Sequence, residues 1–252
     1  MAERRKSPVD RETVEVHQCS VDVRLKILGQ LPFFAGLKPA EMVEINRSFR
    51  EYGFSAEEPI YFAGDPANRL YVVADGRVKL MRPTVAGREV LLEMLIPGEF
   101  FGSLSATEEE EFEETAIAQT PACVLAIEKA AFRNVLAKHP SAALKVLEIV
   151  EGRLKSAHER VRQLSGSPVE KRIAYTLLKL GEKLGEQQKV GLLIQVPLSR
   201  EDLAKMTGTT PETASRVMST FQKDGLIDSG RQWVAITDVE GLEEAARQDP
   251  FA

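Results

Sequence analysis

The sequence predicts an α+β protein: an N-terminal antiparallel β-roll, one long helix and a C-terminal winged helix-turn-helix. Three observations predict this order. Short β-rich runs alternate with glycines over residues 52–127, an apolar stripe with heptad spacing follows over 141–164, and two short helices with matching caps occupy 199–225. Regular short strands separated by glycine turns are typical of an antiparallel barrel or roll.

The N-terminal half begins with a charged stretch, residues 1–20, which lacks an apolar segment. We therefore expect a disordered tail here rather than a signal peptide. Helices are expected at Val21–Gln30, Pro39–Arg50 and Lys129–Lys138. Strands are expected at Pro59–Phe62, Leu70–Val73, Val78–Met81, Val90–Leu95, Thr115–Ala118 and Val124–Ile127. Together these elements place a β-roll domain over residues 21–138.

The stretch Ser141–Leu164 predicts a long helix with a dimerisation seam. Its apolar residues alternate at spacings of three and four, in the order Leu147, Val150, Leu154, Ala157, Val161 and Leu164. This is the a/d spacing of a coiled coil, and charged residues flank it. The alternative is a single helix that packs on its own domain. A proline at 168 ends the pattern, which places a dimerisation helix over 139–165 and a C-terminal domain over 166–248, starting with a helix at Val169–Leu184.

The segment Ser199–Gly225 predicts two helices joined by a tight turn. Ser199 is a good N-cap and is followed three residues later by an acid, which is close to a capping box. Gly208 can supply the positive φ that the turn requires. Thr210 can cap a second helix that starts at Pro211, where a missing N–H costs nothing. We therefore expect the second helix over 211–224.

The exposed face of this second helix presents Glu212, Ser215 and Arg216. Arginine pairs with guanine, glutamate accepts from the cytosine amine, and serine adapts to either base type. A hairpin wing is expected next, with strands at Leu226–Ile227 and Trp233–Ile236 around a turn at Asp228–Ser229–Gly230. The pattern predicts a winged helix-turn-helix that inserts a helix into the major groove of double-stranded DNA. A helical hairpin that only packs a core is the alternative.

Composition narrows the class of protein further. The chain has 252 residues and a formal net charge of −5, so any electrostatic footprint for DNA must be local. No apolar run approaches the ~18 residues that would span a membrane. With only Cys19 and Cys123 there is no disulfide framework, so we expect a cytoplasmic protein. No catalytic triad, metal-ligand spacing or phosphate loop is visible, so the sequence gives no support for an enzyme.

The order of these parts resembles the CRP/FNR family of bacterial transcription regulators, over about residues 25–242. The segments YFAGDPANRLYVVADGRVKLMR and PGEFFGSLS are similar to its cyclic-nucleotide-binding-type domain. The segment SREDLAKMTGTTPETASRVMSTFQKDGLI is similar to its DNA-binding element. The resemblance implies a homodimer whose DNA affinity changes when an effector reaches the roll and the long helix. It also implies RNA polymerase as a partner, in an activator or a repressor.

The recognition helix is similar to the fumarate-nitrate type, which carries the pattern Glu-x-x-Ser-Arg. This resemblance implies half-sites close to TTGAT in an inverted repeat. Arg216 would then bind guanine through two hydrogen bonds, Glu212 would take the cytosine amine, and Ser215 would contact a thymine or adenine edge. The family positions that hold DNA phosphates correspond here to Arg200, Thr210 and Thr213.

The effector pocket departs from the cyclic-AMP pattern of the family. Ser103 follows Gly102 where cyclic-AMP receptors have a glutamate. Glu114 stands where the phosphate-binding arginine is expected, just before Thr115, and Ala157–His158 replaces a Thr-Ser pair. A carboxylate repels a buried phosphate, so the sequence argues against cyclic AMP. The remaining candidates for an effector pocket are Gly102, Ser103, Thr115 and His158.

Other sensing modes follow from the metal-ligating residues. An iron–sulfur cluster takes four cysteine thiolates and the chain has two, which argues against a cluster within one protomer. Candidate haem ligands are His158, Cys19 and His17. The alternative for His158 is an ordinary histidine on a helix surface, and the alternative for Cys19 and His17 is a position in a disordered tail. A thiol switch between the two cysteines, or no effector, stays open. The competing function is a signalling module whose roll senses a ligand and controls a protein partner.

Overall fold

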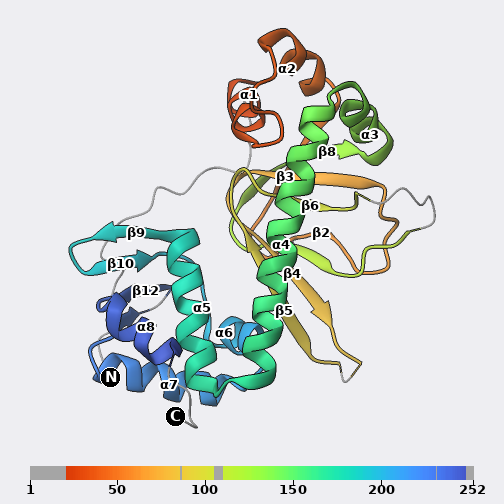
Figure 1. Ribbon diagram of the computed structural model, residues 1–252. Coiled ribbons are helices and arrows are strands. Elements are labelled where there is room, and N and C mark those ends of the chain that lie inside the picture. Colours follow the sequence, from red (N-terminus) through yellow and green to blue (C-terminus); the bar gives the residue numbers. More distant parts are fainter. Residues whose placement is uncertain (1–20, 86, 105–109, 231, 248–252) are drawn as a thin grey trace. The chain divides into compact units, whose positions relative to one another are not determined.

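The computed structural model describes residues 21–85, 87–104, 110–230 and 232–247 (Figure 1). The chain divides into two compact units, and the boundary between them falls between Lys155 and Ser156, inside the long helix α4 (Pro140–Gly166). The expected tail, 1–20, lies outside the described residues.

The N-terminal unit is a roll of two four-stranded antiparallel sheets that carries helices on one side (Figure 1). The first sheet has the order β1 (Phe49–Phe54), β8 (Ala122–Glu128), β3 (Arg69–Asp75), β6 (Phe100–Gly102). The second has the order β2 (Pro59–Tyr61), β7 (Thr115–Ala118), β4 (Val78–Pro83), β5 (Glu89–Leu95). The helices are α1 (Val21–Gln30), α2 (Pro39–Asn46), α3 (Lys129–Lys138) and the first half of α4. The antiparallel roll is confirmed.

The central strand β3 separates two hydrophobic cores. Leu70 and Val72 pack in the core that the helices share, whereas Tyr71 and Val73 point into the space between the two sheets. Successive side chains of a strand point to opposite faces, so a strand covered on both faces is apolar throughout. This accounts for the unbroken apolar run of β3.

The expected helix Pro39–Arg50 is too long. Helix α2 ends at Asn46, and Phe49 already begins β1, where it pairs with Ile127 of β8. The Arg24 guanidinium donates hydrogen bonds to the carbonyl oxygens of Asn46 and Phe49, at 3.1 and 3.0 Å, and so fixes the turn between helix and strand. Neither β1 nor β6 is predicted by the sequence patterns.

The C-terminal unit contains a four-stranded antiparallel sheet and the helices around it. In chain order its elements are α5 (Val169–Leu184), β9 (Gly185–Gln188), β10 (Gly191–Ile194), α6 (Arg200–Thr207), α7 (Pro211–Lys223), β11 (Ile227–Gly230), β12 (Trp233–Ile236) and α8 (Val239–Arg247). The sheet order is β11-β12-β10-β9. The winged helix-turn-helix is confirmed, and β9, β10 and α8 are additions that the sequence patterns do not predict.

The wing differs from the expected one in its turn. The residues expected as the turn, Asp228–Ser229–Gly230, belong to strand β11, and Gly230 lies opposite Trp233. A side chain at Gly230 would start only 2.3 Å from the Trp233 Nε1 atom, so glycine is needed here for close approach to the indole. Gln232, directly before β12, has a φ of +66°.

Candidate nucleic-acid interface

The ends of α6 and α7 are held by the caps that the sequence predicts. The Ser199 hydroxyl accepts a hydrogen bond from the Asp202 N–H at 2.9 Å, and the Asp202 carboxylate accepts one from the Ser199 N–H at 3.0 Å. Gly208 ends α6 with a φ of +61°. The Thr210 hydroxyl accepts from the Thr213 N–H at 3.3 Å. These contacts fix where α7 begins and how it leaves the turn.

Helix α7 has one buried and one exposed face. The buried face consists of Ala214, Val217, Met218 and Phe221. Glu212, Ser215 and Arg216, the predicted base-reading residues, are all exposed. A helix whose apolar face is fully used by its own domain has a fixed orientation, so the polar face points outward on a rigid support.

The two charged residues of this face are both available to a ligand. The Arg216 guanidinium makes no hydrogen bond or ion pair with any residue that the structure describes. The pKa of Glu212 is lowered by a hydrogen bond from its own backbone N–H and by one from the Thr210 hydroxyl. Glu212 is therefore held as a carboxylate, which accepts hydrogen bonds only.

The residues expected at DNA phosphates have partners within the domain. Arg200 is half-buried and donates to the Ser229 hydroxyl of β11 at 3.1 Å, and its burial lowers the pKa of its guanidinium. The Thr210 and Thr213 side chains take part in the cap of α7. Arg200 thus links α6 to the wing, a role that the sequence patterns do not predict. Phosphate contacts by all three residues stay a prediction.

The wing is also tied to the recognition helix. The Gln222 side chain of α7 donates to the Asp228 carboxylate at 2.9 Å and accepts from the Ser229 hydroxyl at 3.3 Å. Side chains of both helices, α6 and α7, therefore hydrogen-bond to β11. These contacts set the wing relative to the exposed face of α7.

The expected dimer seam is an exposed apolar stripe on α4. Leu147, Leu154 and Val161 are 64%, 53% and 61% exposed, and Val150 and Leu164 are exposed as well. Ala157 is partly buried. Charged residues beside the stripe pair along the helix, as in Lys155–Glu151 at 2.7 Å. Exposed apolar side chains in a row between satisfied charges are typical of an interface between proteins.

The candidate effector residues are engaged in local structure. Gly102 has a φ of +91°, and a side chain there would start 2.6 Å from the Arg69 carbonyl oxygen. The Ser103 hydroxyl donates to the Glu110 carboxylate at 2.5 Å, and the Thr115 hydroxyl accepts from the Ala63 N–H at 3.1 Å. The fourth candidate, His158, is exposed and belongs to the C-terminal unit. Their role in an effector pocket stays a prediction.

Four buried aromatic rings that the sequence patterns do not single out lie between the two sheets of the roll. Tyr61 stacks on Phe112 with ring centres 3.7 Å apart, and Tyr71 stacks on Phe101 at 5.2 Å. The Tyr61 hydroxyl donates to the Glu114 carboxylate at 3.1 Å. Burial, followed by the charge of Glu114, raises the pKa of the Tyr61 hydroxyl, which stays protonated.

The remaining sequence candidates lie outside this interior. Cys123 is buried in β8, within the core shared with the helices, and it is disulfide-bonded, contrary to the expectation of unbridged cysteines. His17 and Cys19, expected as haem or thiol candidates, lie outside the described residues. Within the described ranges no group of three His, Cys, Asp or Glu residues is placed to hold a metal ion. None of the helices described is long and apolar enough to cross a membrane.

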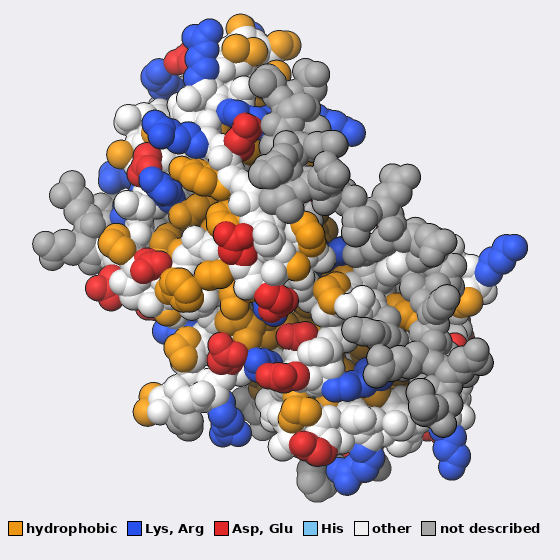
Figure 2. Space-filling model, turned by 180° about the vertical axis from the view of Figure 1, so that it is seen from behind, with side chains coloured by type: hydrophobic (Ala, Val, Ile, Leu, Met, Phe, Trp, Pro, Cys, Tyr) orange, Lys and Arg blue, Asp and Glu red, His pale blue; other side chains and the backbone are white. Residues whose placement is uncertain are grey.

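Acidic and basic side chains are interspersed on the face shown in Figure 2, with hydrophobic side chains exposed among them. The formal net charge of the whole chain is −5. An affinity for DNA must therefore arise from a local set of residues such as the exposed face of α7.

Comparisons with known proteins match both units. The family model "Crp-like helix-turn-helix domain" matches residues 171–245, and the model "Cyclic nucleotide-binding domain" matches residues 53–139. The chain is 32% identical over 215 residues to the cyclic AMP receptor protein of Thermus thermophilus, which covers 85% of this chain and 96% of the relative. It is 27% identical to the CRP-like cAMP-activated global transcriptional regulator of Mycobacterium tuberculosis, over 88% of this chain and 99% of the relative.

A solved structure agrees with these matches. A CRP-family transcriptional regulator from Thermus thermophilus superimposes with a TM-score of 0.66 at 27% identity, covering 78% of this chain and 97% of that one.

Proposed function

Because this chain belongs to the CRP/FNR family of DNA-binding transcription regulators, we propose that it acts as a homodimer that reads a TTGAT-like inverted repeat. The observation that carries this proposal is the exposed face of α7. There the Arg216 guanidinium, which has no partner among the described residues, and the ionised Glu212 carboxylate lie one helical turn apart. Arginine bound to guanine through two hydrogen bonds and glutamate bound to the cytosine amine would read one half-site.

The exposed stripe of α4 supports the homodimer. A helix-turn-helix dimer binds two half-sites about one DNA turn apart, ~34 Å, so one copy alone reads half of the repeat. Burying the stripe against its equivalent in a second copy would remove several exposed leucine and valine side chains from water. RNA polymerase is the further partner that we propose for a regulator of this family.

The effector is proposed to be a molecule other than cyclic AMP, or none. Two relatives are named for cyclic AMP, but in this chain aromatic rings occupy the interior of the roll and the Glu114 carboxylate lies at its edge. A buried phosphate needs a cation or convergent N–H donors. We expect that millimolar cyclic AMP leaves both operator affinity and thermal stability unchanged. A clear gain in either would contradict this part of the proposal.

Haem is tested by the visible absorption spectrum of protein purified without air. A Soret band would establish haem and direct attention to His158, Cys19 and His17. A colourless protein moves the search to organic ligands, to thiol chemistry or to regulation without an effector.

The alternative function, a signalling module that controls a protein partner, is not favoured, because the relatives named above are transcription regulators.

The proposed reading is tested by Arg216→Ala in a gel-shift titration with a TTGAT inverted repeat at fixed salt. Loss of the guanine contact should weaken binding by about 1–3 kcal/mol per half-site. The matched control is Lys223→Ala, which removes an exposed cation from the end of the same helix. It should weaken binding to the repeat and to a scrambled duplex alike. If Arg216→Ala binds as tightly as the wild type, direct reading by α7 is refuted.

A further inference from the structure

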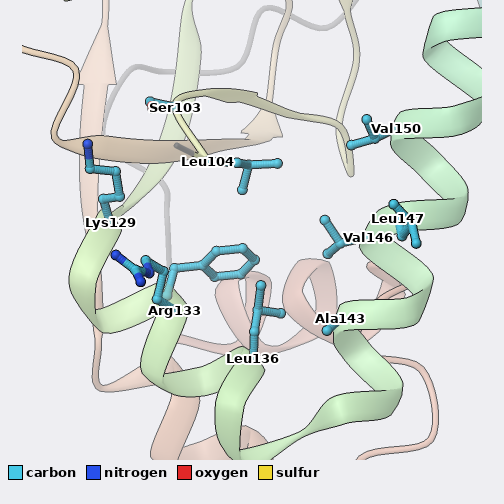
Figure 3. Close-up of a pocket in the computed structure, with 10 residues that line it drawn as sticks. Ser103, Leu104, Lys129, Arg133, Leu136, Ala143, Val146, Leu147 and Val150 are labelled. Atoms are coloured by element: carbon cyan, nitrogen blue, oxygen red, sulfur yellow. The ribbon is translucent and has the colours of Figure 1, made fainter. Parts of the chain in front are cut away.

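The geometry points to a second ligand site, outside the interior of the roll, that takes a small monocarboxylate with an apolar body. The site is a cavity of about 240 Å³ between α3, the first half of α4 and the segment after β6 (Figure 3). All the residues that line it belong to the N-terminal unit. No residue of the four-ring cluster inside the roll lines it.

The walls of the cavity are mainly aliphatic. Leu104 comes from the segment after β6, Leu136 from α3 and Val146 from α4, and Figure 3 shows these three side chains directed toward a common space. Phe132 and Ala143 complete this part of the wall. Such a lining favours an apolar body over a sugar or a phosphate, because it offers few hydrogen-bonding partners.

Two cations of α3 stand at the rim of the cavity. Lys129 and Arg133 lie one turn apart on α3, and both line the cavity (Figure 3). The Lys129 ammonium lies 4.0 Å from the Glu110 carboxylate, whereas the Arg133 guanidinium has no hydrogen bond or ion pair within the described part of the chain. Because Arg133 has no partner among the described residues, we assign it as the group that meets the ligand. A ligand with one negative charge matches this site, and an arginine binds a carboxylate through two parallel hydrogen bonds.

The volume limits the size of the ligand. A cavity of about 150 Å³ holds benzene, whereas drug-sized ligands occupy roughly 300–1,000 Å³. The present cavity therefore fits a body slightly larger than one benzene ring, such as a medium-length acyl chain or a single substituted ring. Octanoate is a suitable probe of this class.

The cavity also adjoins the expected dimer seam. Leu147 and Val150 line the cavity, and both belong to the exposed stripe of α4. A ligand body in the cavity would contact these two side chains and change how the stripe packs on a second copy. This step rests on the proposed homodimer, whereas binding to the cavity itself does not.

Binding is measured on the full-length protein by calorimetric titration with octanoate, octan-1-ol and octylammonium, which differ only in the head group. We expect octanoate to bind at least tenfold more tightly than octylammonium. Arg133→Gln should weaken octanoate binding at least tenfold. Lys138→Gln removes a cation from the same helix, outside the cavity, and should leave binding unchanged.

A second variant tests the cavity rather than its charge. Ala143→Phe places a ring into the cavity and should abolish octanoate binding, and thermal unfolding shows whether each variant is folded. The proposal is overturned if octylammonium binds as tightly as octanoate, or if Arg133→Gln binds octanoate as tightly as the wild type. Full octanoate binding by a folded Ala143→Phe protein would overturn it as well.

The coupling to DNA is tested separately, by operator titration with and without saturating octanoate. An affinity change of at least threefold that Arg133→Gln abolishes is the expected result. Octanoate binding without any change in operator affinity would overturn the coupling. Failure to bind the TTGAT repeat under any condition would overturn the proposed function, and the calorimetric test of the cavity would still decide the ligand site.

Discussion

The recognition helix and the interior of the roll use polar residues in opposite ways. On α7 the apolar side chains are buried in the core of the domain, and Arg216 is exposed with no partner in the described ranges. Inside the roll the Tyr61 hydroxyl is paired with the Glu114 carboxylate, and its ring stacks on Phe112. The polar groups of α7 are exposed to solvent, whereas those inside the roll are paired next to buried rings.

Under the proposed function, the family fold keeps its DNA-binding surface while the interior of the roll does not take cyclic AMP. The relatives named for cyclic AMP share the roll, but the roll alone does not make a nucleotide site. The chemistry of a few side chains decides whether a roll can bind a nucleotide. In this chain the side chains support the proposed reading of DNA by α7 and the proposed carboxylate site beside α4.

The largest expected effect concerns the homodimer, which would bring together two copies of the exposed α7 face. Leu154→Lys places a charge in the exposed stripe of α4, where two copies of it would lie opposite each other. We expect monomers that lose operator binding, measured by analytical ultracentrifugation and gel shift. Ser156→Lys, an exposed neighbour outside the stripe, should stay dimeric. A dimeric Leu154→Lys protein would contradict the coiled-coil assignment.

The next effect tests whether the rings inside the roll are core. Phe112→Ala removes a buried ring that stacks on Tyr61, and we expect a loss of about 3–5 kcal/mol in the free energy of unfolding of the roll. The matched control is Phe62→Ala, whose ring is 56% exposed, and it should cost far less. Chemical denaturation measures both. Equal losses would show that the rings do not form a packed core.

A smaller effect tests the support of the recognition helix. Thr210→Ala removes the hydroxyl that caps α7, and we expect about 1 kcal/mol less stability in the C-terminal unit. Thr210→Ser keeps a hydroxyl at the same position and should restore most of the loss. Urea unfolding followed by the fluorescence of Trp233 reports on this unit. An unchanged midpoint for the alanine variant would rule out a stabilising cap.

The smallest effect concerns pH and the second half of α4. Hydrogen bonds from Arg162 and Gln163 lower the pKa of Glu159 from 4.5 to about 2. Because the pKa is lower in the folded state, the stabilisation is present above pH 4.5 and is lost as the pH falls toward 2. Glu159→Gln should flatten this part of the stability curve, measured by urea unfolding at each pH. Glu170→Gln, an exposed carboxylate on α5, should keep the wild-type curve.

Elements with local punctuation are predicted well from the sequence. The ends of α1, α3, α5 and β12 agree with expectation residue by residue, and the caps at Ser199 and Thr210 form as expected. These signals depend on neighbours within a few residues. The same locality explains why the amino-acid order alone places Glu212 and Arg216 on an exposed face.

Features decided by distant residues are not predicted. Strand β1 forms because Phe49 pairs with Ile127, far along the chain, and no turn signal marks its start. Strand β9 is short and polar, and it forms through pairing with β10. The cavity beside α4 is assembled from residues between Ser103 and Val150, each of which alone fits an ordinary core or surface position.

The boundary between the two compact units falls within α4, which has 27 residues and is about 40 Å long. The hydrogen bonds of one continuous helix therefore cross the boundary between the units. A helix resists stretching more than it resists twisting or gentle bending. Gly152, close to this boundary, weakens the helix by about 1 kcal/mol relative to alanine. A structural change in one unit would then reach the other as a rotation about the axis of α4. Gly152 is the position near the boundary at which the helix would deform most easily.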